Sequence, residues 1–166
     1  MKQSETIQIL QKRLNFTNEA IKKLVTFHDF LLKCNKKYNL ISRSTENEVW
    51  SRHILDSAQL VRFIRSSEAV SISDLGSGAG FPGIILAIHY ENSPFHVKLV
   101  EKSPVKRSFL KQIINKLNLN VELIDSAYKS EASADIIVCR AFKKLREIVK
   151  ISREIYVKPH KIIILK

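Results

Sequence analysis

A glycine-rich segment near the middle of the sequence carries the residue pattern with the most chemical meaning. It runs from Asp74 to Gly83 as Asp-Leu-Gly-Ser-Gly-Ala-Gly-Phe-Pro-Gly and contains all 4 glycines of the chain. Glycine lacks a Cβ atom, so it tolerates sharp turns and lets the backbone approach a bound molecule closely. An apolar run precedes the segment and a helical period follows it. The pattern is typical of a strand–loop–helix unit that holds a nucleotide-like ligand.

Three interpretations of this segment are open: an S-adenosylmethionine (SAM) site, an NAD site, or a tight turn without a ligand. Gly78 to Gly83 also satisfies the G-x-G-x-x-G dinucleotide pattern. Asp74 favours SAM, because a carboxylate beside the loop would repel a pyrophosphate but not a ligand with an ammonium and a sulfonium. Glu101 ends the next apolar run, where a carboxylate can accept both ribose hydroxyls of an adenosine in either class of enzyme. The density of glycines argues against a turn without a ligand.

The residues after the fourth predicted strand bear on the kind of methyl transfer. Enzymes that methylate exocyclic amines of adenine or cytosine usually carry an Asn/Asp-Pro-Pro-aromatic loop there, whereas this chain has Cys139-Arg140-Ala141-Phe142. Cytosine C5 methylation needs a cysteine nucleophile, but the apolar run before Cys139 indicates a buried structural thiol. A guanine N7 lone pair attacks the methyl carbon directly and loses no proton. That reaction needs alignment and charge stabilisation rather than a base, which suits this sequence.

Short apolar runs alternate with helical periods from residue 70 onward. Strands are predicted at residues 70–75, 97–101, 121–124, 135–139 and 161–165, and helices at 83–90, 104–117 and 142–156. Ser103 followed by Pro104 is typical of a helix start. The alternation predicts an α/β protein with a Rossmann-like, SAM-dependent methyltransferase fold, a mainly parallel doubly wound sheet and a ligand at the carboxyl ends of the strands.

The first third of the sequence has helical periodicity. Thr17 is expected to cap one helix, and a second helix is expected to begin at Thr45, where Thr45 and Glu48 have capping-box spacing. The pattern changes near residue 68. We therefore expect an N-terminal helical cap over residues 1–67 and a SAM-binding Rossmann-like core over residues 68–166, together forming one compact domain.

The chain is strongly basic, with 28 Lys and Arg residues against 16 acidic ones and a net charge of +12. Such an excess favours RNA or DNA as a partner over an anionic membrane, although an AT-rich genome would raise the lysine content without any ligand. Cys34 and Cys139 lie far apart and form no C-x-x-C, which excludes a disulfide framework and a cysteine-rich zinc site. The sequence contains no signal-peptide core and no apolar run of membrane-spanning length, so a cytoplasmic protein without a membrane partner is expected.

Several blocks of the sequence resemble one known family. The blocks are Tyr38-Asn39-Leu40, Arg52-His53-Ile54-Leu55-Asp56-Ser57, Asp74 to Gly83, Glu101-Lys102-Ser103-Pro104 and Arg140-Ala141-Phe142. In this order they resemble the bacterial 16S rRNA guanine-N7 methyltransferases of the RsmG, or GidB, family. The second block and the Gly-Phe-Pro-Gly end of the loop are the most specific of them. The resemblance covers about residues 35–166.

The resemblance implies a SAM-dependent enzyme that methylates N7 of a guanine in 16S rRNA, either as free rRNA or within the small ribosomal subunit. We expect the protein to be a monomer without a metal. The resemblance also implies Arg140 as the catalytic residue and SAM contacts from Gly76, Gly78, Phe81, Glu101, Ala127, Tyr128 and Arg140. The glycine pattern of the loop adds Asp74 and Gly80 to the expected SAM-binding residues. The expected RNA-binding residues are Lys36, Lys37, Arg52, Lys143, Lys144 and Arg146. His53 and Asp56 are expected either to brace the glycine loop or to form a helix-cap packing pair.

Two alternatives to an active methyltransferase remain open from the sequence. Family members continue past the position of Leu165-Lys166 into a final antiparallel strand pair, so a chain that ends there is expected to expose an apolar sheet edge. This favours a non-catalytic RNA- or ribosome-binding relic of a methyltransferase. An NAD-linked oxidoreductase is less well supported, because Asp74 and the lack of an evident hydride-transfer constellation count against it.

Overall fold

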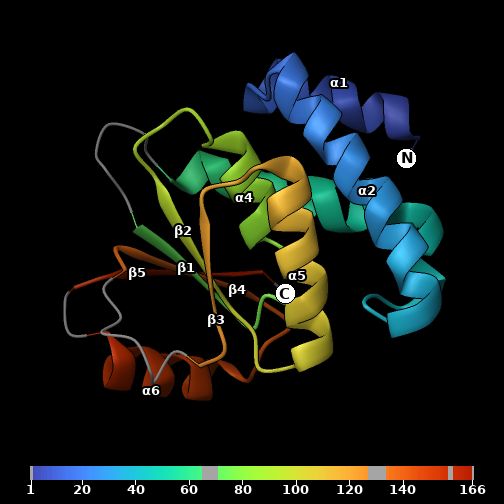
Figure 1. Ribbon diagram of the computed structural model, residues 1–166. Helices are drawn as coiled ribbons and strands as arrows, with labels where there is room; N and C mark the ends of the chain where they lie inside the picture. The colour runs from blue at the N-terminus through green and yellow to red at the C-terminus, as the bar shows by residue number, and fades with distance from the viewer. Residues whose placement is uncertain (1, 65–70, 127–133, 157–158, 166) are drawn as a thin grey trace.

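A central sheet of five parallel strands organises the chain (Figure 1). The computed structural model describes residues 2–64, 71–126, 134–156 and 159–165. The strands are β1 (Ser71–Leu75), β2 (His96–Val100), β3 (Val121–Ile124), β4 (Ile136–Arg140) and β5 (Lys161–Leu165), in the spatial order β3-β2-β1-β4-β5. Every pairing among these strands is parallel, so the predicted α/β class and parallel sheet are confirmed. The order switches between β1 and β4, and ligands of such sheets bind at the carboxyl ends beside the switch.

Helices cover both faces of the sheet, as a doubly wound fold requires. They are α4 (Gly83–His89), α5 (Pro104–Leu117) and α6 (Leu145–Ile155). Figure 1 shows α4 and α5 on one face and α6 on the other. Side chains of β4 alternate accordingly: Ile136 and Val138 pack in the larger apolar cluster, and Ile137 and Cys139 pack in the cluster that contains α6. This period of two places successive strand residues on opposite faces of the sheet.

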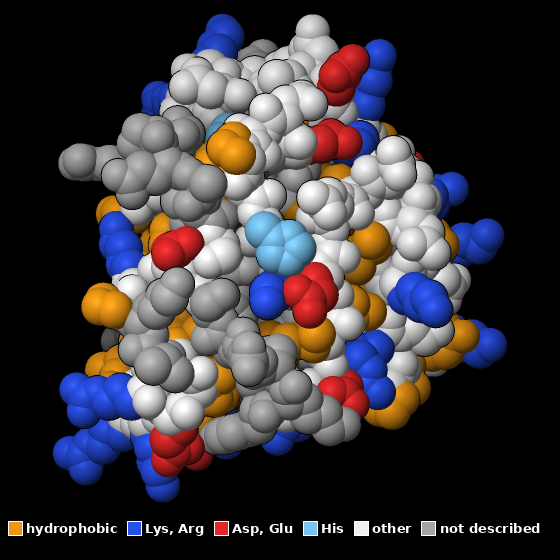
Figure 2. All heavy atoms as spheres, turned by 60° about the vertical axis from the view of Figure 1, so that its left-hand side comes forward, with side chains coloured by type: hydrophobic (Ala, Val, Ile, Leu, Met, Phe, Trp, Pro, Cys, Tyr) orange, Lys and Arg blue, Asp and Glu red, His pale blue; other side chains and the backbone are white. Residues whose placement is uncertain are grey.

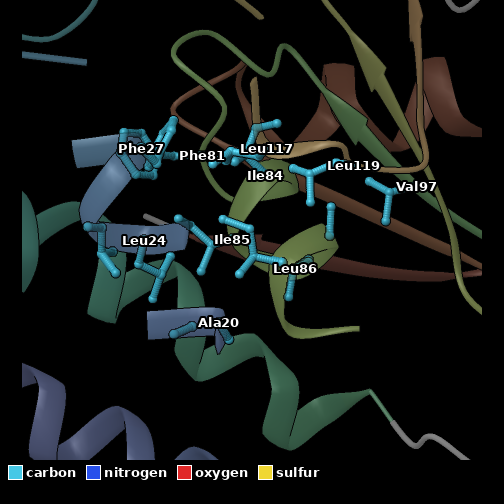
Figure 3. Packing of buried hydrophobic residues seen from close by; sticks show 14 of the residues in the cluster. Ala20, Leu24, Phe27, Phe81, Ile84, Ile85, Leu86, Val97, Leu117 and Leu119 are labelled. Carbon is cyan, nitrogen blue, oxygen red and sulfur yellow. The ribbon is translucent and has the colours of Figure 1, made fainter. Parts of the chain in front are cut away.

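The N-terminal segment packs on the face that carries α4 and α5. It comprises α1 (Gln3–Leu14), α2 (Asn18–Tyr38), the 3-10 turn η1 (Arg43–Glu48), the π-helix η2 (Val49–Leu55), α3 (Asp56–Ala58) and the 3-10 turn η3 (Gln59–Phe63). Figure 3 shows Leu24 and Phe27 of α2 directed toward Ile85 of α4 and Phe81. The predicted boundary at residues 67–68 falls outside the described residues, so the division into cap and core stays a prediction. Within the described ranges, no helix is long and apolar enough to cross a bilayer.

Thr17 caps α2 as the sequence predicts, because its Oγ1 accepts a hydrogen bond from the Ala20 N–H at 3.1 Å. We expect Thr17→Ala to lower the free energy of unfolding by about 1 kcal/mol, since a first-turn N–H loses its acceptor. Urea denaturation followed by fluorescence of Trp50 measures this loss. Thr26→Ala, in the interior of the same helix, is the matched control and should cost little, because alanine favours the helix interior. Equal losses in the two variants would contradict a capping role.

The second helix of the cap differs from the prediction. The chain forms η1 from Arg43 and then the π-helix η2, so no regular helix begins at Thr45 and the predicted capping box is wrong. Thr45 Oγ1 instead donates to the Ser42 carbonyl oxygen at 2.9 Å and lies 2.9 Å from Nε2 of His53. Wide π turns occur frequently at functional sites. This one presents His53 toward the carboxyl end of β4, where it meets Arg140.

Several predicted boundaries shift by one to three residues. The strands predicted at 97–101 and 135–139 are β2 at 96–100 and β4 at 136–140, the helix predicted at 83–90 ends at His89, and the helix predicted at 142–156 is α6 at Leu145–Ile155. Ala141 has a left-handed backbone with φ +47, which ends β4 and delays α6. The helix predicted at 104–117 is confirmed as α5, with Ser103 Oγ accepting from the Lys106 N–H.

Candidate functional site

The glycine loop leaves β1 at Leu75 and enters α4 at Gly83. Gly76, Gly78 and Gly80 have φ values of +74, +58 and +95, a region that residues with a Cβ rarely adopt. A Cβ on Gly76 would overlap the ring of Phe142, and one on Gly80 would lie 2.6 Å from Ile84. A Cβ on Gly78 would meet only the Gly76 carbonyl oxygen, at 3.8 Å. Gly78 therefore faces open space, whereas the other two glycines pack against protein.

A cavity of about 370 Å³ lies beside the loop at the carboxyl ends of the strands. Its lining residues are Leu75, Gly76, Gly78, Val100, Glu101, Lys102, Lys106, Ser126, Ala141, Phe142, Lys143, Ile151 and Ile155. The volume is in the range of small-molecule sites, and an apolar wall with few polar groups is typical of them. Of the predicted cofactor residues, the structure brings Gly76, Gly78 and Glu101 together here.

Glu101 is the most firmly fixed polar residue in the lining of this cavity. The residue is only 8% exposed. One carboxylate oxygen accepts the Gly78 N–H at 2.8 Å and the other accepts the Ser103 N–H at 2.8 Å. Each carboxylate oxygen has a second lone pair, so both can still accept hydroxyl groups of a ligand. The carboxylate thus links the loop to the end of β2 and remains available to the cavity.

Asp74 lies behind the loop rather than in the cavity. It is fully buried, and its Oδ2 accepts the Gly83 N–H at 3.0 Å. Its Oδ1 has no hydrogen-bond partner among the described residues. Burial raises the pKa of Asp74 to about 7, so the side chain carries only part of a negative charge at neutral pH. Asp74 therefore anchors the first turn of α4, and the structure does not bring it to the ligand side of the loop.

This burial changes the physical reason for preferring SAM over a dinucleotide. A pyrophosphate binds to free backbone N–H groups of the loop and the following helix. Here the Gly78 N–H is bound to Glu101 and the Gly83 N–H is bound to Asp74. Of these two residues, only Gly78 lines the cavity, and Glu101 occupies its amide. The geometry therefore favours an adenosine ligand without phosphates, and Glu101 rather than Asp74 carries that preference.

Arg140 ends β4 and turns toward the cap instead of lining the cavity. Its guanidinium donates to the carbonyl oxygen of Arg52 at 3.2 Å, lies 2.5 Å from Nδ1 of His53, and lies 3.7 Å from the carboxylate of Asp56. It also stands over the ring of Phe81, 5.1 Å from the centroid. Burial lowers the pKa of Arg140, and the negative charge of Asp56 opposes that shift. Arg140 therefore connects the cap to the glycine loop.

His53 contacts the loop directly, as the bracing interpretation expects. Its ring stacks on Phe81 with the centroids 5.1 Å apart and the planes at 27°. Burial and then the charges of Arg140 and Arg52 lower the pKa of His53 to about 4. The ring is accordingly neutral at pH 7, and its Nδ1 accepts from Arg140. Asp56 contacts the loop only indirectly, through Arg140.

Several predicted cofactor residues lie elsewhere. Phe81 is 3% exposed and packs edge-on against Phe27 at 5.3 Å, so it belongs to the core. Gly80 packs against Ile84 and Leu110 rather than toward the cavity. Ala127 and Tyr128 lie outside the described residues.

Cys139 is fully buried, and burial followed by the charge of Asp74 raises the pKa of its thiol to about 11. A thiol with that pKa stays protonated and is a poor nucleophile. The structural role expected from the sequence agrees with this environment. Across the described ranges, no group of three or more His, Cys, Asp or Glu side chains is arranged to hold a metal ion.

The residues that form the apolar wall of the cavity were not predicted from the sequence. Leu75 and Val100 are the last residues of two strands, and Ile151 and Ile155 are one helical turn apart on α6. Strand ends and an i, i+4 apolar pair were available as signals. Their convergence on one cavity, however, depends on the sheet order, which the sequence does not reveal.

The predicted RNA-binding residues are all exposed and lie at three places. Lys36 and Lys37 are in the last turn of α2, Arg52 is in η2, and Lys143, Lys144 and Arg146 surround the start of α6. In Figure 1 the end of α2 and the start of α6 lie on opposite sides of the start of α5. Figure 2 shows the side on which the strands begin, where acidic side chains stand between the basic ones.

The chain matches a family model described as rRNA small subunit methyltransferase G over residues 7–166. A protein of Rickettsia bellii named ribosomal RNA small subunit methyltransferase G is 40% identical over 145 residues, which are 87% of this chain and 73% of the relative. A protein of the same name from Bartonella tribocorum is 36% identical over 149 residues, which are 87% of this chain and 69% of the relative.

Solved structures that resemble this chain include two described as SAM-dependent methyltransferases in complex with S-adenosyl-L-homocysteine. The one from Thiobacillus denitrificans has a TM-score of 0.54 at 14% identity, over 82% of this chain and 53% of that chain. The one from Geobacter sulfurreducens has a TM-score of 0.54 at 15% identity, over 84% of this chain and 54% of that chain. This chain thus spans about half the length of each, and the likeness shows the fold.

Proposed function

The chain belongs to the rRNA small subunit methyltransferase G family, and from this membership we propose that it binds SAM and transfers the methyl group to N7 of a guanine in 16S rRNA. The observation that carries the cofactor assignment is the position of Glu101, which accepts the Gly78 N–H and still borders the cavity. SAM supplies an electrophilic methyl group when bound. Everything else in the reaction depends on how the chain holds and aligns its two substrates.

The cavity offers groups that suit an adenosine with an amino-acid tail. Glu101 would accept the ribose hydroxyls, and the open space at Gly78 would let the loop backbone approach the ligand. Val100 and Phe142 add apolar surface for a purine or a thioether. Asp74 and Phe81 would act from behind the loop by fixing its shape. Contacts from Ala127 and Tyr128 remain predictions.

The acid–base groups near the cavity are compatible with methylation of a guanine N7. N7 loses no proton when it attacks, so no general base is needed. Glu101 is held by two backbone amides, and His53 lies in the cluster with Arg140, where its Nδ1 already accepts a hydrogen bond. Arg140 would contribute by positioning the loop through Phe81 rather than by moving a proton. The rate enhancement would then come from alignment of N7, methyl carbon and sulfur.

The family name supports ribosomal RNA as the substrate, and we propose that 16S rRNA in the small subunit is the physiological form. The protein would act as a cytoplasmic monomer without a metal. Exposed lysine and arginine side chains near the cavity would bind phosphates without selecting a sequence. Since N7 of a paired guanine lies in the deep, narrow groove of A-form RNA, the target guanine would be unpaired or transiently opened.

The decisive experiment combines binding and turnover. Isothermal titration calorimetry should show micromolar binding of S-adenosylhomocysteine, the expected product, and no binding of NADH. Small subunits that lack the modification should then gain N7-methylguanine when incubated with the protein and SAM, as measured by mass spectrometry of nucleosides. Binding of S-adenosylhomocysteine without turnover on either free rRNA or subunits would favour the non-catalytic alternative. Binding of NADH in place of S-adenosylhomocysteine would favour the oxidoreductase.

Lys144 and Arg146 provide a test of the RNA surface that leaves the cavity intact, because neither lines it. We expect the double variant Lys144→Glu, Arg146→Glu to bind rRNA at least roughly tenfold more weakly at low salt. The slope of log affinity against log salt should fall by about two. Affinity for S-adenosylhomocysteine should be unchanged. The control variant Lys12→Glu, Lys22→Glu makes the same charge change at exposed positions on α1 and α2. Equal losses in both variants would show that net charge alone drives binding.

A further inference from the structure

Ala141 has a backbone conformation that is unusual for its residue type. Its φ of +47 lies in the left-handed region, which disfavours any side chain with a Cβ. The other non-glycine residues with positive φ in the described ranges are Asn15, Asn39 and Asn118, and asparagine tolerates this region. Ala141 is exposed, so burial of its methyl group does not explain the conformation. The surrounding contacts must therefore hold it in place.

The left-handed turn separates the side chains on either side of Ala141. In an extended strand, residues two apart point to the same face of the sheet. Arg140 indeed follows the face of Ile136 and Val138 toward the cap, whereas Phe142 packs in the cluster with α6 on the opposite face. The conformation of Ala141 therefore directs the side chains of Arg140 and Phe142 to opposite faces of the sheet.

These two side chains reach opposite ends of the glycine loop. Arg140 stands over the ring of Phe81, near the end of the loop. Phe142 covers Gly76 at its start, where a built Cβ would lie 3.0 Å from Cε2 of the ring. Between them, Gly78 faces the cavity that Ala141 and Phe142 also line. One short segment therefore contacts the loop at both ends.

We propose that Ala141 is a positioning residue for the cofactor site: its left-handed backbone lets Arg140 and Phe142 hold the glycine loop from both ends in its binding conformation. This inference rests on the proposed function, because the loop conformation matters for SAM. A residue that resists positive φ would relax the segment toward an extended form. Phe142 would then leave Gly76, and the loop would lose one of its two supports.

Calorimetric titration of three variants with S-adenosylhomocysteine tests this role. Ala141→Val should weaken binding by at least about tenfold, because a β-branched residue is strongly disfavoured at positive φ. Ala141→Gly should bind within about twofold of the parent chain, since glycine adopts this φ without strain. Asn118→Val is the matched control: it strains the left-handed C-cap of α5, at the end of that helix away from the cavity. It should lower the melting temperature and leave the affinity unchanged.

Hydrogen exchange of the unliganded protein separates failure of this inference from failure of the proposed function. The Gly76 N–H is bonded to the Val100 carbonyl oxygen at 2.9 Å and the Gly78 N–H to Glu101. Both amides should exchange faster in Ala141→Val than in the parent chain or in Asn118→Val, whether or not a ligand binds. Unchanged exchange in folded Ala141→Val, or equal loss of affinity in Asn118→Val, would overturn the positioning role. Absence of binding by the parent chain would instead count against the SAM assignment.

Discussion

Replacing Gly78 with valine should reduce the affinity for S-adenosylhomocysteine by at least about a hundredfold, a change of about 2.7 kcal/mol. Two effects act together. A valine at φ +58 is strained by about 1–3 kcal/mol in the loop conformation. Its side chain would also project into the space where the ligand should lie, because nothing closer than the Gly76 carbonyl oxygen, 3.8 Å away, surrounds the Cβ position.

The fold itself should tolerate Gly78→Val better than the binding site does. Gly80→Val is the informative comparison, because its Cβ would lie 2.6 Å from Ile84 and 3.3 Å from Leu110. That overlap is with packed core, so Gly80→Val should lower the free energy of unfolding by about 1–3 kcal/mol beyond the backbone strain. Calorimetric titration and urea denaturation of both variants separate the two kinds of loss. Undiminished affinity in folded Gly78→Val would show that the ligand does not contact this part of the loop.

The elements that could be predicted from the sequence are those that local patterning determines. The N-cap at Thr17 and the helix 104–117 follow from side-chain chemistry within one turn. The five strands follow from apolar runs, and their parallel arrangement follows from the helices between them. The largest error, the helix predicted from Thr45, occurs where long-range contacts accompany a departure from the local preference. At residues 45–55, the contacts of His53 with Arg140 and Phe81 accompany a π-helix that no capping pattern predicts.

The candidate site was predictable in its location but not in the direction of each side chain. The glycine spacing and Glu101 identify the loop and the strand end that face the cavity. Whether Asp74 and Arg140 point to the cavity depends on the face of the sheet on which each side chain falls, and this requires the exact strand register. Both fall on the face that α4 and the cap cover, so they support the loop from behind. The positive φ of Ala141 leaves no signal in the sequence, since alanine is not the residue type expected there.

The stability of the protein should depend on pH through Asp74. Its pKa in the folded chain is about 7, against 3.8 for the ordinary side chain, and the main cause is burial. The folded state therefore binds more protons than the unfolded state between these two values. Stability from this group is fully present below about pH 4 and is lost as pH rises through about 7. A shift of about three units corresponds to a loss on the order of 4 kcal/mol.

Asp74→Asn isolates this effect, because the amide oxygen can still accept the Gly83 N–H while the ionisable group is gone. Urea denaturation between pH 5 and pH 9 should show the parent chain losing stability relative to the variant as pH rises, with a plateau above about pH 8. His53 and other groups titrate in both proteins, so the difference between the two curves removes their contributions. Glu19→Gln, which removes an exposed carboxylate from the first turn of α2, is the matched control for the loss of one negative charge and should not reproduce the difference between the parent chain and Asp74→Asn. Parallel profiles for the parent chain and Asp74→Asn would mean that Asp74 is fully ionised at neutral pH. In that case its negative charge behind the loop would again be available to favour a cationic ligand over a pyrophosphate.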